Sequence, residues 1–514
     1  MPVFRYLWLA TIVSNIGTWM YNAASGWLMT SLSPDPVIVS LVQVTNSLPL
    51  FLFALPAGAL ADIVDRRRFI LTLEILTTVF SAIFATLLWM HVVTPALLLL
   101  FLFLIGVLGA LEAPAWQAIV PQLVPGDVLS SAIASNSLGV NISRAVGPAL
   151  AGILILSLGT AAPFWLDAIS NVGVIAVILW WRSPAKSRTG LPAERLAGAI
   201  RTGLRYARHN RNLRVTLIRS AAFFLFASAY WALLPLLSRT QLRGGPTLYG
   251  ILLGTIGIGA IGGAMMLPRL QASLRTNGLV SLGAVGTAAA LILFGAAHEP
   301  WMGTLACVVA GLSWILALAS LNVSAQSALP DWVRGRGLAA YVTVFFGAMS
   351  AGSALWGLVA QRAGLAAAHF AAAAGILLAA AATSRLKLHT TRTADLAPSM
   401  HWPEPVVAID LDHDSGPVLV TVEYLTDPEH REAVLRALGR IARERKRDGA
   451  YRWGLFQDAS RPERLLETFL VDSWLEHLRQ HQRVTNADRL VQEQIRKLLR
   501  EEPLVTHFIA SEPE

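Results

Sequence analysis

The chain has 514 residues, of which 54% are hydrophobic and only 14% are charged, and its formal net charge is +9. Soluble proteins usually carry about 25% charged residues, so this composition excludes a surface that is mostly exposed to water. A single cysteine, Cys307, excludes a disulfide framework and a cysteine metal cluster. The arginines lie between long apolar runs, which favours membrane topology over nucleic-acid binding as the origin of the basic balance.

Apolar runs alternate along the first three quarters of the chain with breaks that contain Pro, Gly or charged residues. About 20 apolar residues cross the hydrocarbon core as a helix, so these runs predict an all-α membrane fold with twelve transmembrane helices. The first run is too long for a cleavable signal and is expected to remain as a helix. The predicted spans are residues 5–31, 36–61, 68–91, 95–119, 131–158, 161–181, 214–238, 247–268, 277–297, 301–326, 337–362 and 365–385.

Lys and Arg concentrate in the loops that follow even-numbered spans. These loops contain Arg66 to Arg68, a basic run from Arg182 to Arg214, and the pairs Arg269 with Arg275 and Arg334 with Arg336. Because cytoplasmic loops carry an excess of Lys and Arg, both termini are expected to be cytoplasmic. The predicted location is the plasma membrane, which is the inner membrane in bacteria.

The second span ends in a short motif, Gly58-Ala-Leu-Ala-Asp62, before the basic cluster Arg66 to Arg68. Gly58 has no side chain and would permit close helix approach. Asp62 can accept hydrogen bonds from the start of a neighbouring helix, whose dipole favours an anion. Arg66 and Arg67 can pair with acidic groups on other spans, which predicts a latch on the cytoplasmic side. The alternative is that the arginines only set the topology.

Two further segments resemble motifs of one family when they are taken with Gly58 to Arg68. Residues 144–152, which contain Gly147, Pro148 and Gly152, are similar to the Gly-Pro motif of exporters of the major facilitator superfamily. Residues 330–336 are similar to a segment of its enterobactin-exporter-like branch, the transmembrane secretion effectors. The usual first motif has Gly where this chain has Asp65. The resemblance covers about residues 1–390.

This resemblance implies a major facilitator fold, with two six-helix bundles at residues 1–181 and 214–386 that are joined by a cytoplasmic linker at 182–213. It also implies that the eleventh span, which opens near Arg334 and Arg336, is the partner of the latch. Gly147 and Pro148 would bend the fifth span because Pro removes a backbone hydrogen bond. A packing kink without an exporter role is the alternative.

Four ionisable residues fall at predicted membrane depth, where a charge costs roughly 2.5–3.5 kcal/mol or more. Arg144 is expected near mid-membrane, with Glu112 or Asp167 as its acidic partner. Glu112 is either a proton-coupling group or half of a structural ion pair with Arg144. Asp167 is a second proton-coupling candidate, although helix-to-helix hydrogen bonding is the simpler role. Glu74 is expected to pair with the basic loop beside it.

Polar and aromatic residues on the first, second, seventh and tenth spans are candidates for a substrate cavity. An aromatic, mildly polar pocket suits amphipathic organic solutes better than ions or sugars. Ordinary helix packing is the competing explanation for each of them. The candidates are Trp19, Asn22, Asn46, Tyr230, Trp231 and Trp314.

The C-terminal part changes character, since residues 1–386 hold 23 Lys or Arg against 10 Asp or Glu, whereas the rest holds 18 against 22. A linker is predicted at 387–415. Residues 416–514 show a β-α-β-β-α-β order typical of a ferredoxin-like α+β domain, and they resemble domains of antibiotic-biosynthesis-monooxygenase type. His477, His481 and Trp474 could indicate an enzyme, but no second metal or nucleophile signature accompanies them. A regulatory or dimer-forming role is therefore expected instead of catalysis.

The sequence thus predicts a secondary transporter that exports small organic molecules in exchange for protons, with the lipid bilayer as its surroundings. It predicts no catalytic residue, no metal site, no cofactor and no nucleic-acid partner. The main alternative is a membrane sensor whose helices receive a ligand and whose cytoplasmic tail signals. A membrane-bound oxygenase that uses the tail is the third hypothesis.

Overall fold

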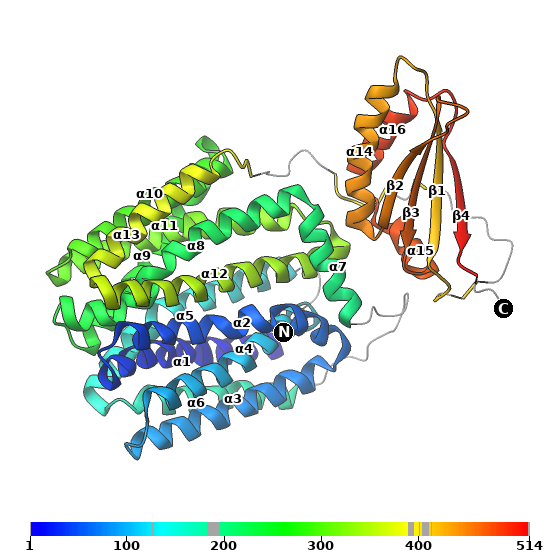
Figure 1. Ribbon diagram of the computed structural model, residues 1–514. Coiled ribbons are helices and arrows are strands. Elements are labelled where there is room, and N and C mark those ends of the chain that lie inside the picture. Colours follow the sequence, from blue (N-terminus) through cyan, green and yellow to red (C-terminus); the bar gives the residue numbers. More distant parts are fainter. Residues whose placement is uncertain are drawn as a thin grey trace. The chain divides into compact units, whose positions relative to one another are not determined.

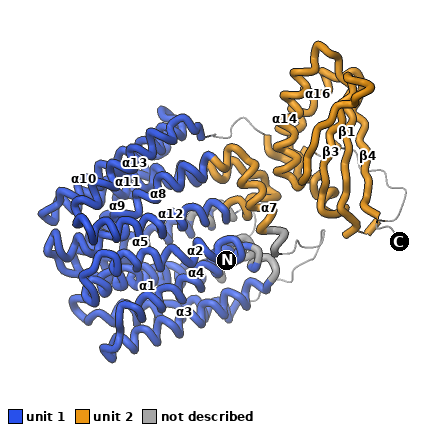
Figure 2. Tube along the Cα trace, viewed as in Figure 1, with its two compact units in different colours: residues 1–196, 215–323, 339–388 blue, residues 197–214, 324–338, 389–514 orange. Residues whose placement is uncertain are grey.

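The computed structural model describes residues 2–124, 128–181, 196–388, 395–399, 401–402, 411–412 and 414–511. Their contacts form two compact units, drawn in different colours in Figure 2. The first unit contains residues 1–196, 215–323 and 339–388, and the second contains residues 197–214, 324–338 and 389–514. The predicted linkers at 182–213 and 387–415 lie partly outside the described residues.

Long helices form the first unit, and they run side by side in Figure 1. Proline occupies the first position of several of them, where its missing N–H has no helical partner to lose. Their bounds are α1 (Pro2–Leu32), α2 (Pro36–Ile63), α3 (Arg66–Trp89), α4 (Pro95–Leu123), α5 (Leu129–Leu158), α6 (Ala162–Trp180), α8 (Arg211–Leu236, continued by a π-helical turn at Leu237–Gln241), α9 (Pro246–Ser273), α10 (Thr276–Ala296), α11 (Pro300–Ser327), α12 (Arg334–Ala363) and α13 (Leu365–Thr383).

Among the described residues, eleven helices are long and apolar enough to cross a membrane. The helix α1 is not one of them, although its 31 residues give it the length. Its polar side chains, such as Ser14, Asn15 and Asn22, lower its mean hydropathy. The polarity is satisfied inside the protein, since Ser14 is buried and donates a hydrogen bond to Asn171 of α6 at 2.7 Å.

The helices of the first unit contact one another in two groups. In the first group α1 contacts α5 and α6, α2 contacts α4, and α3 contacts α4 and α6, while in the second group α10 contacts α13. The helix α5 joins the groups by packing along α9. Tyr21, Phe84 and Phe164 form an aromatic core between α1, α3 and α6, with ring centroids 4.7–6.1 Å apart.

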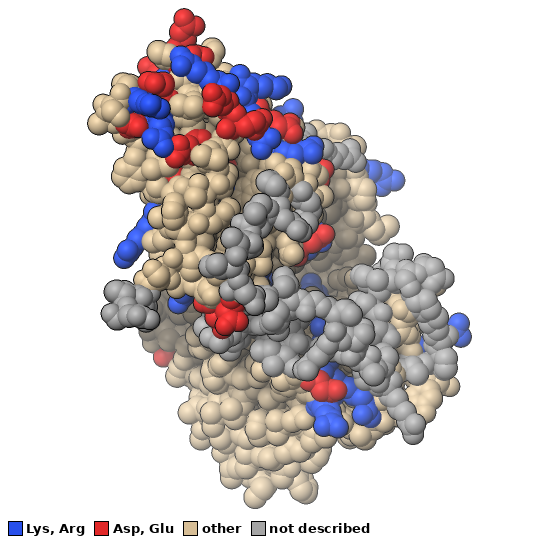
Figure 3. Space-filling view, turned by 90° about the vertical axis from the view of Figure 1, so that its right-hand side faces the viewer, with Lys and Arg blue, Asp and Glu red and all other residues tan. Residues whose placement is uncertain are grey.

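The outer surface of the first unit is apolar. The side chains of Trp89, Leu156 and Leu378 are each more than 70% exposed, and uncharged residues, in tan, cover most of the lowest part of the face in Figure 3. Such a surface is too large and too apolar for contact with water, and helices whose backbone hydrogen bonds are satisfied internally can place it against lipid.

The second unit contains a four-stranded antiparallel sheet with strand order β2-β3-β1-β4. In β1 every second residue is buried, because alternate side chains point to opposite faces of a strand. The elements of this unit are α7 (Leu196–His209), a short 3-10 turn (Asp331–Val333), β1 (Val418–Leu425), α14 (Arg431–Asp448), β2 (Tyr451–Gln457), β3 (Arg464–Val471), α15 (Trp474–Arg483), α16 (Asn486–Arg496) and β4 (Leu504–Ile509).

The β-α-β-β-α-β order predicted for residues 416–514 is seen in the structure, with a second helix added before the last strand. Two helices, α15 and α16, fill the connection between β3 and β4, and each begins at a side-chain cap, Ser473 and Thr485 respectively. Val484, between these caps, is extended and separates the two helices.

A buried carboxylate organises the sheet and its helices. Glu467 of β3 is fully buried and accepts hydrogen bonds from Tyr424 Oη at 2.7 Å and Trp453 Nε1 at 2.8 Å. Arg445 of α14 supplies the balancing charge at 3.4 Å. Removal of one partner from such a buried pair leaves an uncompensated charge, which costs about 3–5 kcal/mol.

Replacement of Glu467 by alanine is therefore expected to unfold the sheet region while the helices of the first unit stay folded. Limited proteolysis of the full-length protein in detergent measures this as new cleavage within residues 416–514. Glu429→Ala, at an exposed position of the same unit, is the matched control and should leave the cleavage pattern unchanged. Equal protease resistance of both variants would contradict the assigned role.

Candidate functional site

Two acidic side chains of neighbouring helices form a pair inside the first unit. The carboxyl groups of Glu74 on α3 and Glu112 on α4 hydrogen-bond each other. An ionised carboxylate can only accept hydrogen bonds, so this contact requires a proton on one of the two groups. Glu74 is buried and Glu112 is half-buried. The pair can therefore hold one proton between its carboxyl groups, and the side chain of Glu112 keeps part of its surface exposed.

This pairing corrects two expectations. Glu112 was predicted to pair with Arg144, and Glu74 with the adjacent basic loop, but each has the other as its partner. The reason is helix packing, because α3 lies directly against α4, whereas Arg144 on α5 points to α1. The Arg144 guanidinium lies over the ring of Trp19 with 5.1 Å to the centroid.

Arg144 is compensated only in part by this stacking. A cation–π contact contributes about 0.5–2 kcal/mol, which is less than the cost of a charge at membrane depth. Its buried Nε has no hydrogen-bond partner among the described residues. Arg144 is thus a half-buried cation with unused hydrogen-bonding capacity, and this capacity is available to an anionic or polar solute.

Asp167 connects three helices. Its carboxylate accepts a hydrogen bond from Ser81 Oγ of α3 at 2.7 Å, and it lies close to α1, where the Thr18 hydroxyl donates to the Ser14 carbonyl oxygen at 3.2 Å. The residue itself is on α6 and is buried. The backbones of α1 and α6 approach closely beside it, since a Cβ added at Gly17 would lie 3.0 Å from the Asp167 Cα. This geometry is that of helix-to-helix hydrogen bonding, which is the simpler role weighed for Asp167.

Asp167→Ala and Asp167→Asn are expected to differ. Alanine leaves the buried Ser81 hydroxyl without its acceptor and should destabilise the helical unit by about 1–3 kcal/mol, whereas asparagine retains an acceptor oxygen and should unfold close to the wild type. Thermal unfolding in detergent measures the difference. If the asparagine variant were stable but inactive in transport, Asp167 would have a proton-carrying role as well, and equal stability of all three proteins would contradict the bridging role.

The expected latch residues of the second span and the following loop have other contacts in the first unit. A Cβ added at Gly58 would meet no atom within 4 Å, so Gly58 does not serve a close helix contact, contrary to expectation. Arg67 donates to the backbone oxygens of Ile178 at 3.0 Å and Leu179 at 2.8 Å. It therefore caps the last turn of α6 instead of pairing with an acidic group.

Asp65, at which the chain departs from the usual motif, is the N-cap of α3 and accepts from the backbone N–H of Arg68 at 2.8 Å. Asp65 therefore stabilises the start of α3, because its carboxylate accepts a hydrogen bond from a backbone N–H that has no partner within the helix.

The side chain of Asp62 lies outside the described residues. Arg66 has an interaction partner. Arg334 and Arg336 belong to the second unit, where Arg334 pairs with Asp331.

The Gly-Pro motif lies where α5 contacts two helices at once. A Cβ added at Gly147 would come within 2.5 Å of the Trp19 Cβ on α1, and one at Gly152 would come within 2.6 Å of the Pro246 carbonyl oxygen on α9. A Cβ on Gly250 of α9 would overlap the Pro148 carbonyl oxygen. Gly152 and Gly250 therefore allow backbone-to-backbone contact between the two helix groups, and Gly147 allows close contact between α5 and α1 within the first group.

The two helix groups also meet at the end of the unit where α1 finishes. Arg239 donates to Ser31 Oγ at 2.7 Å and to Thr30 Oγ1 at 3.2 Å, and its guanidinium lies over Trp27. Gln361 of α12 donates to Asp35, the N-cap of α2, at 2.9 Å. The bonds across this end are polar and few, so they can form and break at modest cost.

Three of the predicted cavity residues come together. Tyr230 and Trp231 of α8 contact Trp314 of α11, with ring centroids 6.3 and 5.5 Å from it, and the Trp231 Nε1 has no hydrogen-bond partner among the described residues. Tyr230 is fully buried, whereas Trp231 is half-buried. The other candidates are not part of this cluster in the described contacts, because Trp19 stacks with Arg144, and Asn22 and Asn46 are half-buried on α1 and α2.

A family model described as transmembrane secretion effector matches residues 1–514. The chain belongs to the transmembrane secretion effector family. It is therefore a multi-pass membrane transporter rather than an enzyme, as the sequence predicts.

Characterised relatives of this family member include exporters. The staphyloferrin A transporter of Staphylococcus aureus is 25% identical over 54% of this chain and 69% of that protein. The multidrug efflux pump Tap of Mycolicibacterium fortuitum is 26% identical over 72% and 92%, and the enterobactin exporter EntS of Shigella boydii is 26% identical over 65% and 80%. An auto-inhibited POT family peptide transporter shares the fold, with a TM-score of 0.61 at 13% identity over 76% of this chain and 99% of that one.

Some residues of this secretion effector were not found by sequence reasoning. Phe224, Phe294 and Phe345 complete the aromatic cluster around Tyr230 and Trp314, and they carry no signal beyond hydrophobicity. The pairing of Glu74 with Glu112 did leave a signal. Each stands roughly two to three turns from an end of its helix, and the two ends, the start of α3 and the end of α4, are predicted to lie on the same side.

Part of the predicted linker at 182–213 is helix α7 of the second unit, and this helix has a buried face. Leu204 is exposed, whereas Thr202, Tyr206 and Ala207 are buried. The reason is that α7 packs against parts of its own unit. The Tyr206 ring meets Trp332 at 5.7 Å, and Arg205 forms an ion pair with Glu476 of α15 at 3.2 Å. Burial opposes ionisation of Glu476, but Arg483 and Arg205 together hold its pKa below the usual value.

Proposed function

We propose that this transporter exports small amphipathic organic molecules of siderophore or drug type in exchange for protons, by alternating access of two six-helix bundles. The carboxyl pair of Glu74 and Glu112 is the observation that carries the coupling part of this proposal. The named relatives, which include siderophore exporters and a multidrug pump, support the class of solute.

The acid pair couples protons to transport because its hydrogen bond depends on protonation. With one proton the two carboxyls hold α3 and α4 together; with none, two negative charges repel each other in a medium of low dielectric constant. Loss of the proton on the inner side and its return on the outer side therefore change the contact between these helices. Protonation shifts the equilibrium between the inward-open and outward-open states only if the pair binds protons with different affinity in the two states. The affinity differs because the pair is more hydrated in the state in which it faces open water.

The solute is proposed to contact the cluster of Trp231, Trp314 and Phe345 on one side and Arg144 with Trp19 on the other. Aromatic rings bury apolar surface, and the spare donors of Arg144 suit a carboxylate, catecholate or polar oxygen. Asn22 and Asn46 would add amide groups from α1 and α2. Tyr230 is buried beneath the cluster and is proposed to support it rather than to touch the solute.

In the proposed topology both termini are cytoplasmic and the helices lie in the bacterial inner membrane. The bundles at 1–181 and 214–386 are joined by the linker at 182–213, and the linker at 387–415 leads to a ferredoxin-like domain at 416–514 that regulates transport or forms dimers. The latch predicted from Asp62, Arg66, Arg334 and Arg336 remains part of this proposal, whereas Arg67 caps the end of α6.

Transport by the full-length protein in proteoliposomes tests this function. With dyes, antibiotics and siderophores as the solutes, an imposed pH gradient should drive solute movement, and protons should move in the opposite direction. Solute movement at the same rate without the gradient would overturn proton coupling. Solute binding without any net movement would overturn the transport function and favour the membrane sensor, in which the second unit signals.

A further inference from the structure

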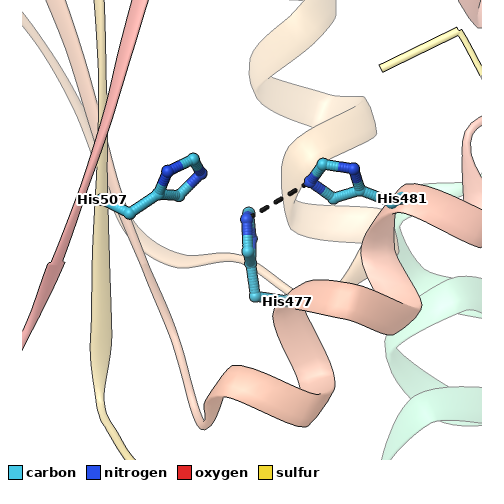
Figure 4. Close-up of side chains that lie close together, drawn as sticks. All are labelled: His477, His481 and His507. Carbon is cyan, nitrogen blue, oxygen red and sulfur yellow. Dashed lines mark hydrogen bonds between the residues drawn. The ribbon is translucent and has the colours of Figure 1, made fainter. Parts of the chain in front are cut away.

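Three histidine side chains of the second unit converge although they come from separate elements. His477 and His481 stand four residues apart on α15, so they lie on the same face of the helix. His507 is on β4, where it pairs in register with Val420 of the central strand β1. Figure 4 shows the rings of His477 and His481 extending from one helix toward the side on which His507 projects from its strand.

The distances between the ring nitrogens suit a metal ion. The Nε2 atoms of His477 and His481 are 3.3 Å apart. Zinc bound tetrahedrally at about 2.0–2.1 Å from each nitrogen places neighbouring ligand nitrogens about 3.3–3.4 Å apart. One nitrogen from each of the three rings lies within 4.8 Å of the others, so His507 needs a shift of roughly 1.4 Å to reach the same spacing.

The donor set selects a class of ion. The three ligands are imidazole nitrogens, which suit Zn²⁺, Co²⁺, Ni²⁺ and Cu²⁺ rather than Mg²⁺ or Ca²⁺. A histidine with its ordinary pKa is mostly neutral near pH 7, and a neutral ring keeps the lone pair that a metal needs.

The neighbourhood tolerates the added charge. Arg445 is the arginine whose charge acts on His477 and His481, and this charge is balanced by the buried Glu467. The rings of Trp402 and Trp474 flank the cluster, at 5.0 Å from His481 and 6.1 Å from His507. An aromatic shell of this kind limits the access of water and favours the retention of a bound ion.

A stack of hydrogen-bonded rings is the competing explanation for the cluster. One proton between His477 and His481 would account for their 3.3 Å contact. It would not account for His507, which is joined to them by ring contact alone, with centroids 4.6 Å from His477. A metal uses one nitrogen of each ring and explains why all three converge.

We propose that His477, His481 and His507 bind one divalent transition-metal ion of the zinc and cobalt class, with a fourth coordination position open to water or another ligand. The helix that supplies two of the ligands also carries Glu476, the partner of Arg205 on α7. Occupancy of the site therefore fixes the helix to which α7 is attached.

Binding of Co²⁺ to the full-length protein, purified with an affinity tag that contains no histidine, tests the proposal. Titration should give one Co²⁺ per chain with the intense visible absorption of a four-coordinate ion, and Zn²⁺ should displace it. His481→Gln and His507→Gln should each weaken binding by about 100-fold or more, since even the loss of supporting groups costs 10–100-fold. These two variants alter different elements, so a folding failure in one leaves the other informative.

His430→Gln, at an exposed histidine of the same unit, is the matched control and should bind Co²⁺ as the wild type does. Far-UV circular dichroism and the thermal midpoint show that each variant is folded. The proposal is overturned if the wild type takes up no stoichiometric Co²⁺, or if folded His481→Gln and His507→Gln bind it as tightly as the control.

Discussion

Glu112→Gln is expected to reduce transport driven by a pH gradient strongly while leaving the protein folded and able to bind solute. Glutamine is isosteric with the protonated acid and can still hydrogen-bond Glu74, so the contact between α3 and α4 persists. It cannot release a proton, however, and the pair is then fixed in one state. The expected loss of gradient-driven solute movement is about tenfold or more, since linked sites are typically coupled by 5–150-fold.

Glu74→Gln should have the same direction of effect, because either residue can hold the shared proton. The matched control is Glu299→Gln, at an exposed position in the connection between α10 and α11, which should transport as the wild type does. Solute-driven proton movement in proteoliposomes and equilibrium solute binding are measured in parallel. Wild-type proton movement in a protein that carries both substitutions would show that the acid pair is structural, and proton coupling would then have to be assigned elsewhere.

Much of the helical architecture could be predicted from the sequence because the signals that define it are local. Proline at positions 36, 95, 246 and 300 both ends a loop and begins a helix, and the predicted starts coincide with the observed ones within a residue. The apolar composition between those prolines sets the helix length. The helix α1 was predicted as a helix, but it is not among the described helices that are apolar enough to cross a membrane, because polar residues interrupt its apolar pattern.

Partners across helices were less predictable, because they depend on the rotation of each helix about its axis. The positions of Arg144 and Glu112 within their helices could be predicted from the sequence, but the partner of each residue could not. The contact of Gly147 with the Trp19 Cβ turns Arg144 toward α1, and no local signal reports such a contact. The same holds for His507, since its place beside His477 follows from the register of β4 on β1, whereas the i,i+4 spacing of His477 and His481 was visible in the sequence.

Gly250→Val is expected to reduce transport by about 5–150-fold, although the helices themselves remain intact. A Cβ at this position overlaps the carbonyl oxygen of Pro148, which is backbone and cannot rotate away. Overpacking of a tight contact costs typically 1–3 kcal/mol, and here the cost falls on the state in which α5 and α9 touch. If transport requires the two bundles to close at this end and reopen, the variant spends less time closed and fewer cycles are completed.

Gly262→Val is the control on the same helix, since a Cβ at Gly262 meets no atom within 4 Å. A direct readout of closure comes from the paired substitutions Asp35→Cys and Gln361→Cys, which replace two side chains that hydrogen-bond across the same end at 2.9 Å; the native Cys307 is buried and should not interfere. Oxidative cross-linking of this pair should fall when Gly250→Val is added and stay high with Gly262→Val. Unchanged cross-linking together with lost transport would mean that Gly250 acts on a step other than closure, because the populations of the closed and open states would then be the same in both proteins.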